Sequence, residues 1–220
     1  MMLKHLSRWC QAGLFASMLL GTAACSAQPA SSAPNYTDGD EYITLPHPQR
    51  YSADGKVEVD EVFSYGCIHC AEFAPLADKL RRSLPPGVVF KLIPAAFNEA
   101  WLPFAQAYYA SKDLGLVDRT HLQLFQAKFG EHYPINSLDE LADFYARNGA
   151  DRARFLQIAN SPETMARIKR DTALIQQWQV DGTPTLIVDG KYRVNEVESR
   201  QELADVALWL AKRELAAKAK

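Results

Sequence analysis

The sequence predicts an α/β fold in which a small sheet domain is interrupted by a large block of helices. A strand–helix–strand pattern covers residues 56–93, and strand patterns resume only at residues 185–194. Cys70 and Thr183, which lie in these two regions, are 113 residues apart, whereas a whole βαβ unit needs about 30 residues. Most of the chain between them is therefore expected to be a helical insertion.

The first sheet segment opens with residues 56–64, where apolar residues alternate and then run together, as in a strand buried within a sheet. A helix is expected over residues 68–84, and the sequence Pro85-Pro86-Gly87 ends it. Residues 88–93 form the next apolar strand. The helix prediction depends on apolar residues at helical spacing, which are Phe73, Leu76, Ala77 and Leu80.

The middle block predicts five helical segments. Residues 100–114 and 117–129 each end at a glycine, and N-cap residues at Ser137, Asp151 and Ser161 mark the starts of three more helices. Aromatic residues gather in this block. They are expected to form its core, or to line an apolar groove for unfolded substrates, and they are Trp101, Phe104, Tyr108, Phe125, Phe144, Tyr145 and Trp178.

The second sheet segment is predicted as a β-hairpin. Thr185–Val188 and residues 191–194 are strand-like, and the two residues Asp189-Gly190 between them are typical of a tight hairpin turn. A terminal helix begins near Glu202. The resulting boundaries are a sheet domain over 41–97 and 179–213, a helical insertion over 98–178, and a frayed tail over 214–220.

Residues 1–25 have the features of an export signal. A basic start with Lys4 and Arg8 precedes an apolar stretch that is too short to span a bilayer, and small residues lead to Cys25. Such a run before a cysteine resembles a lipoprotein signal, although Thr22 stands where leucine is usual. Both lipidation at Cys25 and ordinary secretion remain open, and residues 26–40, rich in Ser, Ala and Pro, are expected to be a flexible tether.

The overall composition is that of a globular protein, with 48% hydrophobic and 23% charged residues among 220. The formal net charge is −2 at pH 7. Nucleic-acid binding is excluded on this ground, because it would require a clustered basic surface.

The cysteines point to redox chemistry. Of the four, Cys10 and Cys25 belong to the export signal, so the folded body keeps only Cys67 and Cys70. A disulfide that closes so small a ring adds little stability, since cross-links between distant residues constrain the unfolded chain most. An exported chain that keeps only this pair is expected to use it for chemistry.

The spacing of the pair suggests how that chemistry works. Cys67 precedes a helix, whose unpaired N–H groups and dipole favour a thiolate, and Cys70 follows one turn later, within reach of a mixed disulfide. Cys67 is therefore the predicted nucleophile and Cys70 the more buried resolving cysteine. The imidazole of His69 between them is expected to stabilise the Cys67 thiolate further.

The segment Phe63–Cys70 (FSYGCIHC) and the later Gly182-Thr183-Pro184-Thr185 resemble the thioredoxin superfamily, and the helical insertion resembles its DsbA branch. The similarity covers residues 40–213. The family's pattern has proline where this chain has Ile68, which leaves the strength of the oxidant open.

The resemblance implies a thioredoxin-like sheet domain and a protein thiol-disulfide oxidoreductase of the periplasm. It implies that Glu61 is a buried acid that exchanges a proton with the second cysteine. It also implies that Thr183-Pro184 is a cis pair that binds an extended substrate strand. The redox-active disulfide serves in place of a cofactor. The expected partners are reduced or unfolded exported proteins and a DsbB-like, quinone-linked membrane protein that reoxidises the pair.

Two alternatives remain. The first is a disulfide isomerase or reductase on the same fold; such isomerases usually carry an added dimerisation domain, for which residues 26–40 are too short and too polar, so we expect a monomer. The second is a metal-binding module with Cys67, His69 and Cys70 as ligands. Three ligands within one helical turn make a poor tetrahedral site, so we expect no metal.

Overall fold

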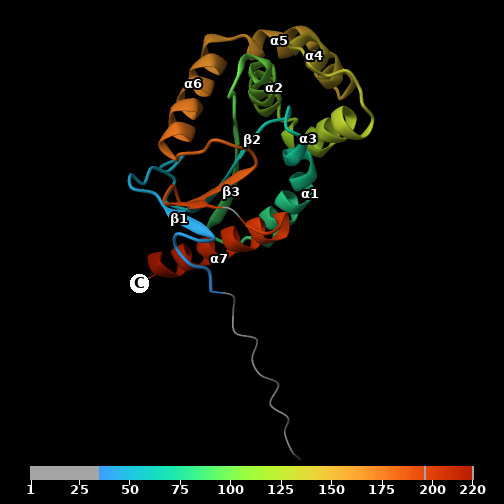
Figure 1. Cartoon of the computed structure of the whole chain (residues 1–220). Helices are drawn as coiled ribbons and strands as arrows, with labels where there is room; N and C mark the ends of the chain where they lie inside the picture. Colours follow the sequence, from blue (N-terminus) through green and yellow to red (C-terminus); the bar gives the residue numbers. More distant parts are fainter. Residues whose placement is uncertain (1–34, 196, 220) are drawn as a thin grey trace, which may run out of the picture. The chain divides into compact units, whose positions relative to one another are not determined.

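The computed structural model describes residues 35–195 and 197–219, so the predictions for the export signal, Cys25 and residues 26–34 lie outside the described residues. The predicted fold class is confirmed. Within this range the chain forms a sheet in the order β1-β5-β4-β2-β3 (Figure 1). The strands are β1 (Tyr42–Thr44), β2 (Val57–Phe63), β3 (Val88–Pro94), β4 (Thr185–Val188) and β5 (Tyr192–Val194).

Strand β2 lies inside the sheet between β4 and β3, and all seven of its residues are buried. It pairs in parallel with β3, which follows it through helix α1 (Ile68–Ser83), and antiparallel with β4, which arrives from the far side of the helical block. This double pairing buries even the three acidic residues of the strand, Glu58, Asp60 and Glu61.

Helices cover both faces of the sheet (Figure 1). Because side chains alternate along a strand, Val57 and Val59 of β2 face α1 and the terminal helix α7 (Arg200–Lys218), while Val62 faces α6 (Pro162–Gln177). Burial of each such aliphatic side chain contributes roughly 1.5–3 kcal/mol. The two apolar layers fix where β2 ends, and therefore where the cysteine loop begins.

The predicted helical block is present between β3 and β4. A short 3₁₀ turn (Glu99–Trp101) leads into its helices, and a π-helical turn (Gln126–Gly130) replaces the end of the helix predicted over 117–129. The helices are α2 (Leu102–Asp113), α3 (Val117–Phe125), α4 (Leu138–Arg147), α5 (Arg152–Ala159) and α6. The predicted capping box of Ser137 and Glu140 is formed at the start of α4.

One aromatic residue lies elsewhere than expected. Trp178 was predicted in the core of the helical block, but it packs with Val62, Ile93 and Ile187 against the sheet. Its indole Nε1 donates a hydrogen bond to the carbonyl oxygen of Gln49 at 2.8 Å. The residue follows α6 directly, so it joins that helix to the sheet domain.

The predictions at both ends of the described chain need correction. The tether predicted over residues 26–40 ends earlier, because the Tyr36 ring packs edge-on against Trp209 at 5.6 Å and the Asp38 carboxylate accepts a hydrogen bond from the Thr44 amide at 3.0 Å. Strand β1, which the sequence pattern did not indicate, follows and pairs with β5.

The frayed tail predicted over residues 214–220 is wrong for its first part, since α7 continues to Lys218. Glu214 is buried because it pairs with Lys191 and accepts a hydrogen bond from the Tyr192 hydroxyl at 3.0 Å. Lys218 pairs with Asp189 at 3.2 Å, so strand β5 and its turn hold the last helical turns in place. Across the described residues, no helix is both long and apolar enough to cross a membrane.

Candidate active site

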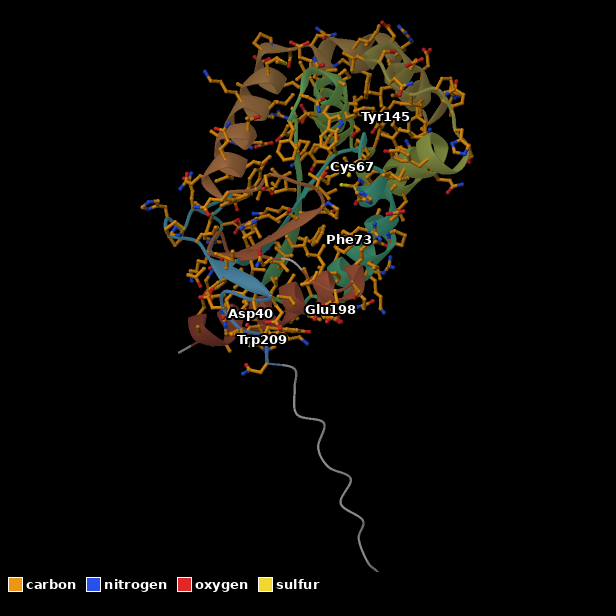
Figure 2. The ribbon with its side chains drawn as sticks, in the orientation of Figure 1. Asp40, Cys67, Phe73, Tyr145, Glu198 and Trp209 are labelled. Atoms are coloured by element: carbon orange, nitrogen blue, oxygen red, sulfur yellow. The ribbon has the colours of Figure 1, made fainter. Side chains whose placement is uncertain are left out.

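The two cysteines lie at the start of α1, where this helix meets the helical block (Figure 2). Cys67 is the N-cap residue, with an extended backbone and no side-chain cap, so its sulfur takes the place where a capping oxygen usually sits. Cys67 is 8% exposed and Cys70 is fully buried. Both cysteines are therefore buried, and the sulfur predicted to be exposed is only slightly the more accessible of the two.

The loop between α6 and β4, which comes late in the sequence, contacts Cys67. The Thr183–Pro184 peptide bond is cis, as predicted. The Cys67 thiol donates a hydrogen bond to the carbonyl oxygen of Thr183 at 3.4 Å, across 116 residues of sequence. The two motifs that the sequence singled out therefore form one site.

The two thiols differ strongly in acidity. A hydrogen bond from the Cys70 thiol, together with the backbone N–H groups of Cys70 and His69, lowers the pKa of Cys67 to about 5. Burial raises the pKa of Cys70, and its hydrogen bond to Cys67 and the nearby Glu61 raise it further. At neutral pH the reduced site therefore holds one thiolate, on Cys67, and one thiol.

Glu61 lies on β2 beneath the cysteines and is 1% exposed. Burial, and then the charge of Cys67, raise its pKa to about 8. Among the described residues, its Oε2 has no hydrogen-bond partner. Glu61 lines a cavity of about 220 Å³ between α1, β3 and α3, together with Leu92, Val117 and His121.

His69 is placed differently from the sequence-based expectation. Its backbone N–H is among the groups that bond the Cys67 sulfur, whereas its ring is 64% exposed and lies against Glu72 and Arg200. The direct support of the thiolate thus comes from the backbone of His69, and the role of the ring stays a prediction.

An aromatic cluster supports the cysteine loop from the side of the helical block. The Tyr65 hydroxyl lies 3.0 Å from Nδ1 of the buried His121, and Phe63 and Phe125 pack around both rings. Burial lowers the pKa of His121 to about 4, so this ring is neutral at physiological pH. His121 also lines the cavity at Glu61.

Gly66 shows how closely the loop and the helical block approach. A Cβ at this position would lie 3.0 Å from the Phe104 ring and 3.1 Å from Trp101. A side chain here would therefore push α2 away from the residue that precedes the nucleophile. Sequence spacing alone gave no sign of this contact.

No group of three or more His, Cys, Asp or Glu side chains is arranged to hold a metal ion in the described part of the chain. The metal-binding alternative therefore has no ligand set among these residues.

Comparison with known proteins supports the same family as the geometry. Residues 87–207, more than half of the chain, match the DSBA-like thioredoxin domain family. The chain belongs to the DsbA family. It is 35% identical to the thiol:disulfide interchange protein DsbA of Pseudomonas aeruginosa, over 86% of this chain and 90% of that protein. It is 34% identical to DsbA of Burkholderia cepacia, over 79% of this chain and 82% of that protein.

Solved DsbA structures have the same fold. Pseudomonas aeruginosa DsbA matches with a TM-score of 0.78 and 35% identity, covering 84% of this chain and 97% of that one. DsbA from Xylella fastidiosa matches with a TM-score of 0.78 and 33% identity, covering 82% and 98%. The protein is therefore a thiol-disulfide oxidoreductase with a thioredoxin-like domain and a helical insertion.

The acidity of the site gives a first testable prediction. Thiolate absorbance near 240 nm in the reduced protein is expected to rise with a midpoint near pH 5, from Cys67 alone. Cys67→Ser is expected to remove this transition, and Cys70→Ala to shift it upward, because alanine has no donor to replace the hydrogen bond from the second thiol. A midpoint at the ordinary value of a free thiol, about 8.5, would contradict the assignment.

Proposed function

We propose that this DsbA-family protein donates a Cys67–Cys70 disulfide to reduced proteins exported from the cell. The observation that supports this direction is the low pKa of Cys67, because a stabilised thiolate favours the reduced form of the pair. At pH 7 a pKa of about 5 favours the thiolate by about two units, or roughly 3 kcal/mol, which is on the order of 60 mV for a two-electron couple. This free energy favours transfer of the disulfide to a client.

The reaction has two exchange steps. A client thiolate attacks the Cys67 sulfur, which forms a mixed disulfide and releases Cys70 as a thiolate that takes up a proton. A second client thiolate then attacks the client sulfur of the mixed disulfide and expels the Cys67 thiolate. Two client thiols become one disulfide, and the cysteine pair gains the two electrons.

The client is expected to bind beside the cis peptide. A groove of about 430 Å³ lies beside Thr183, whose carbonyl oxygen contacts Cys67, and its walls come from the Thr183-Pro184 loop, His69 and the start of α7. An extended peptide could pair with the backbone of Thr183 in the manner of an added strand. The residues that line the groove are His69, Thr183, Pro184, Val197, Glu198, Ser199, Arg200 and Leu203.

Glu61 is proposed to exchange the proton of Cys70. The raised pKa of about 8 keeps its carboxyl group protonated at neutral pH, so it can protonate Cys70 when that sulfur leaves as a thiolate. The same group, once ionised, can take the proton back during reoxidation. The nearby charge of an ionised Glu61 would raise the pKa of Cys70, which supports the proposed exchange between the two groups.

We further propose that the protein works in the periplasm and that a DsbB-like, quinone-linked membrane protein removes the two electrons. The basis is the export signal of residues 1–25 and membership of the DsbA family. A lipid on Cys25 would tether the protein to the membrane. The intact mass of the mature protein tests this, because a lipidated Cys25 at the N-terminus adds the mass of its acyl groups.

A glutathione redox titration tests the oxidant proposal. DsbA itself has a reduction potential of about −120 mV and thioredoxin one of about −270 mV. The potential of this protein is expected to lie closer to that of DsbA. Equilibrium can be followed by the ratio of oxidised to reduced protein after acid quenching. A value near that of thioredoxin would instead favour the reductase alternative.

Trapping tests which cysteine meets the client. Cys70→Ser, mixed with a disulfide-containing peptide, is expected to accumulate a mixed disulfide through Cys67, because no second sulfur is present to release the peptide. Cys67→Ser is expected to accumulate none, since the remaining thiol is buried and weakly acidic. Gel mobility without reductant gives the measurement, and adducts in the second variant alone would reverse the assignment.

A pH profile tests the proton exchange at Glu61. Its folded pKa lies above the ordinary value of a carboxyl group, so the protonated acid is available up to pH 8 and is lost above it. The rate of client oxidation should carry a falling limb near pH 8. Glu61→Gln is expected to abolish that limb and slow the reaction at neutral pH by about tenfold or more.

The exposed Glu163→Gln on α6 is the matched control and should keep the wild-type profile. An unchanged profile in the Glu61 variant would show that Cys70 exchanges its proton with solvent directly.

A further inference from the structure

Two charged residues outside the cysteine motif contact the His69 ring. Nδ1 of His69 lies 3.2 Å from Oε2 of Glu72 and 3.1 Å from Nη2 of Arg200. Arg200 also pairs directly with Glu72. Glu72 lies on α1 with His69, whereas Arg200 is the first residue of α7, so the cluster joins the redox helix to the far wall of the client groove.

The position of Arg200 is unusual for its helix. The first turn of a helix disfavours a cation, because the unpaired N–H groups there carry partial positive charge. The cap of α7 is supplied by other residues, since the Ser199 side chain accepts a bond from the Glu202 amide at 3.1 Å. Arg200 is therefore not required to begin the helix, and the contacts it makes are those to Glu72 and His69.

The shared nitrogen of His69 restricts the possible states of the ring. A ring nitrogen carries either a proton or a lone pair, so Nδ1 can donate to Glu72 or accept from Arg200, but it cannot do both. The two neighbours thus favour opposite proton positions on the same ring. Which one prevails decides whether the ring of His69, whose backbone N–H bonds the Cys67 sulfur, carries its proton on Nδ1.

The carboxylate also bears on the thiolate. The hydrogen bond with His69 and the charge of Arg200 hold the pKa of Glu72 below its ordinary value, so this residue is ionised whenever the site works. A negative charge within two turns of Cys67 on the same helix opposes a second negative charge on the sulfur. Arg200 offsets that repulsion, because its guanidinium pairs with Oε2 of Glu72, the oxygen that also contacts His69.

We propose that Arg200 and Glu72 are positioning residues that act as a pair on His69 and set the reduction potential of the cysteine pair in opposite directions. The proposal rests on the oxidoreductase function of Cys67 and Cys70. Arg200 makes the protein a stronger oxidant by neutralising Glu72 beside the thiolate. Glu72 makes it a weaker one.

The test is a set of glutathione titrations on the mature protein and four variants. Arg200→Gln is expected to shift the equilibrium constant about threefold toward the disulfide, and Glu72→Gln about threefold toward the dithiol, as expected for one charge several ångströms away in water. Threefold corresponds to about 14 mV, at 29.6 mV per tenfold change. The double variant should return to the wild-type value, and Arg200→Lys, which keeps the charge, should stay close to it.

Arg154→Gln is the matched control, because it removes the same charge from α5 in the helical block, where the side chain bonds Gln157. It should leave the potential unchanged. In 1 M salt, the shifts of the two single variants should shrink, because the screening length falls to about 3 Å. The ¹⁵N shifts of His69 should move toward the Nδ1-protonated form in Arg200→Gln.

Three outcomes would overturn the proposal. Shifts of the same sign in Arg200→Gln and Glu72→Gln would indicate a general disturbance of the site. A shift in Arg200→Gln no larger than in the Arg154→Gln control would show that its charge does not reach the sulfur. An unchanged His69 spectrum would remove the positioning role. Each value is a difference from the wild-type potential. The variants therefore test the roles of Arg200 and Glu72 even if the wild-type protein proves to be a reductant.

Discussion

The site depends on a single meeting point, where the first turn of α1 and the cis loop of Thr183 converge on one sulfur. Neither segment could stabilise a thiolate alone. The helix supplies backbone amides and the Cys70 thiol, and the loop supplies a fixed wall 3.4 Å from the sulfur. The rest of the fold serves to bring these segments together, although 116 residues separate them in the sequence.

Strand β2 brings these two segments together, because it pairs with both β3 and β4. Its parallel neighbour β3 fixes α1 on one face, and its antiparallel neighbour β4 begins directly after Pro184. The helical block begins after β3 and ends before β4. The pairing of β2 with these two strands therefore does not depend on the length of the block. The same strand carries Glu61, which places the buried acid beneath the cysteines without any further element.

Much of this arrangement could be predicted from the sequence. Cys67, Cys70 and Thr183-Pro184 stand in short motifs whose local patterns show a strand end, a helix start and a turn. The contact of His69 with Glu72 and Arg200 could not be predicted, because Arg200 reaches it from a helix 131 residues away. Strand β1 was missed because its partner strand, β5, lies far along the chain, and the end of α7 was misjudged because its stabilising partners lie on β5 and in the turn before it.

The close contact at Gly66 joins two parts of the molecule that could otherwise vary independently. The loop before the nucleophile rests directly on Phe104 and Trp101, so a repacking of the insertion moves the sulfur as well. Substitutions at Phe104 or Trp101 are therefore expected to reach the cysteine loop, although both side chains lie outside the cysteine motif.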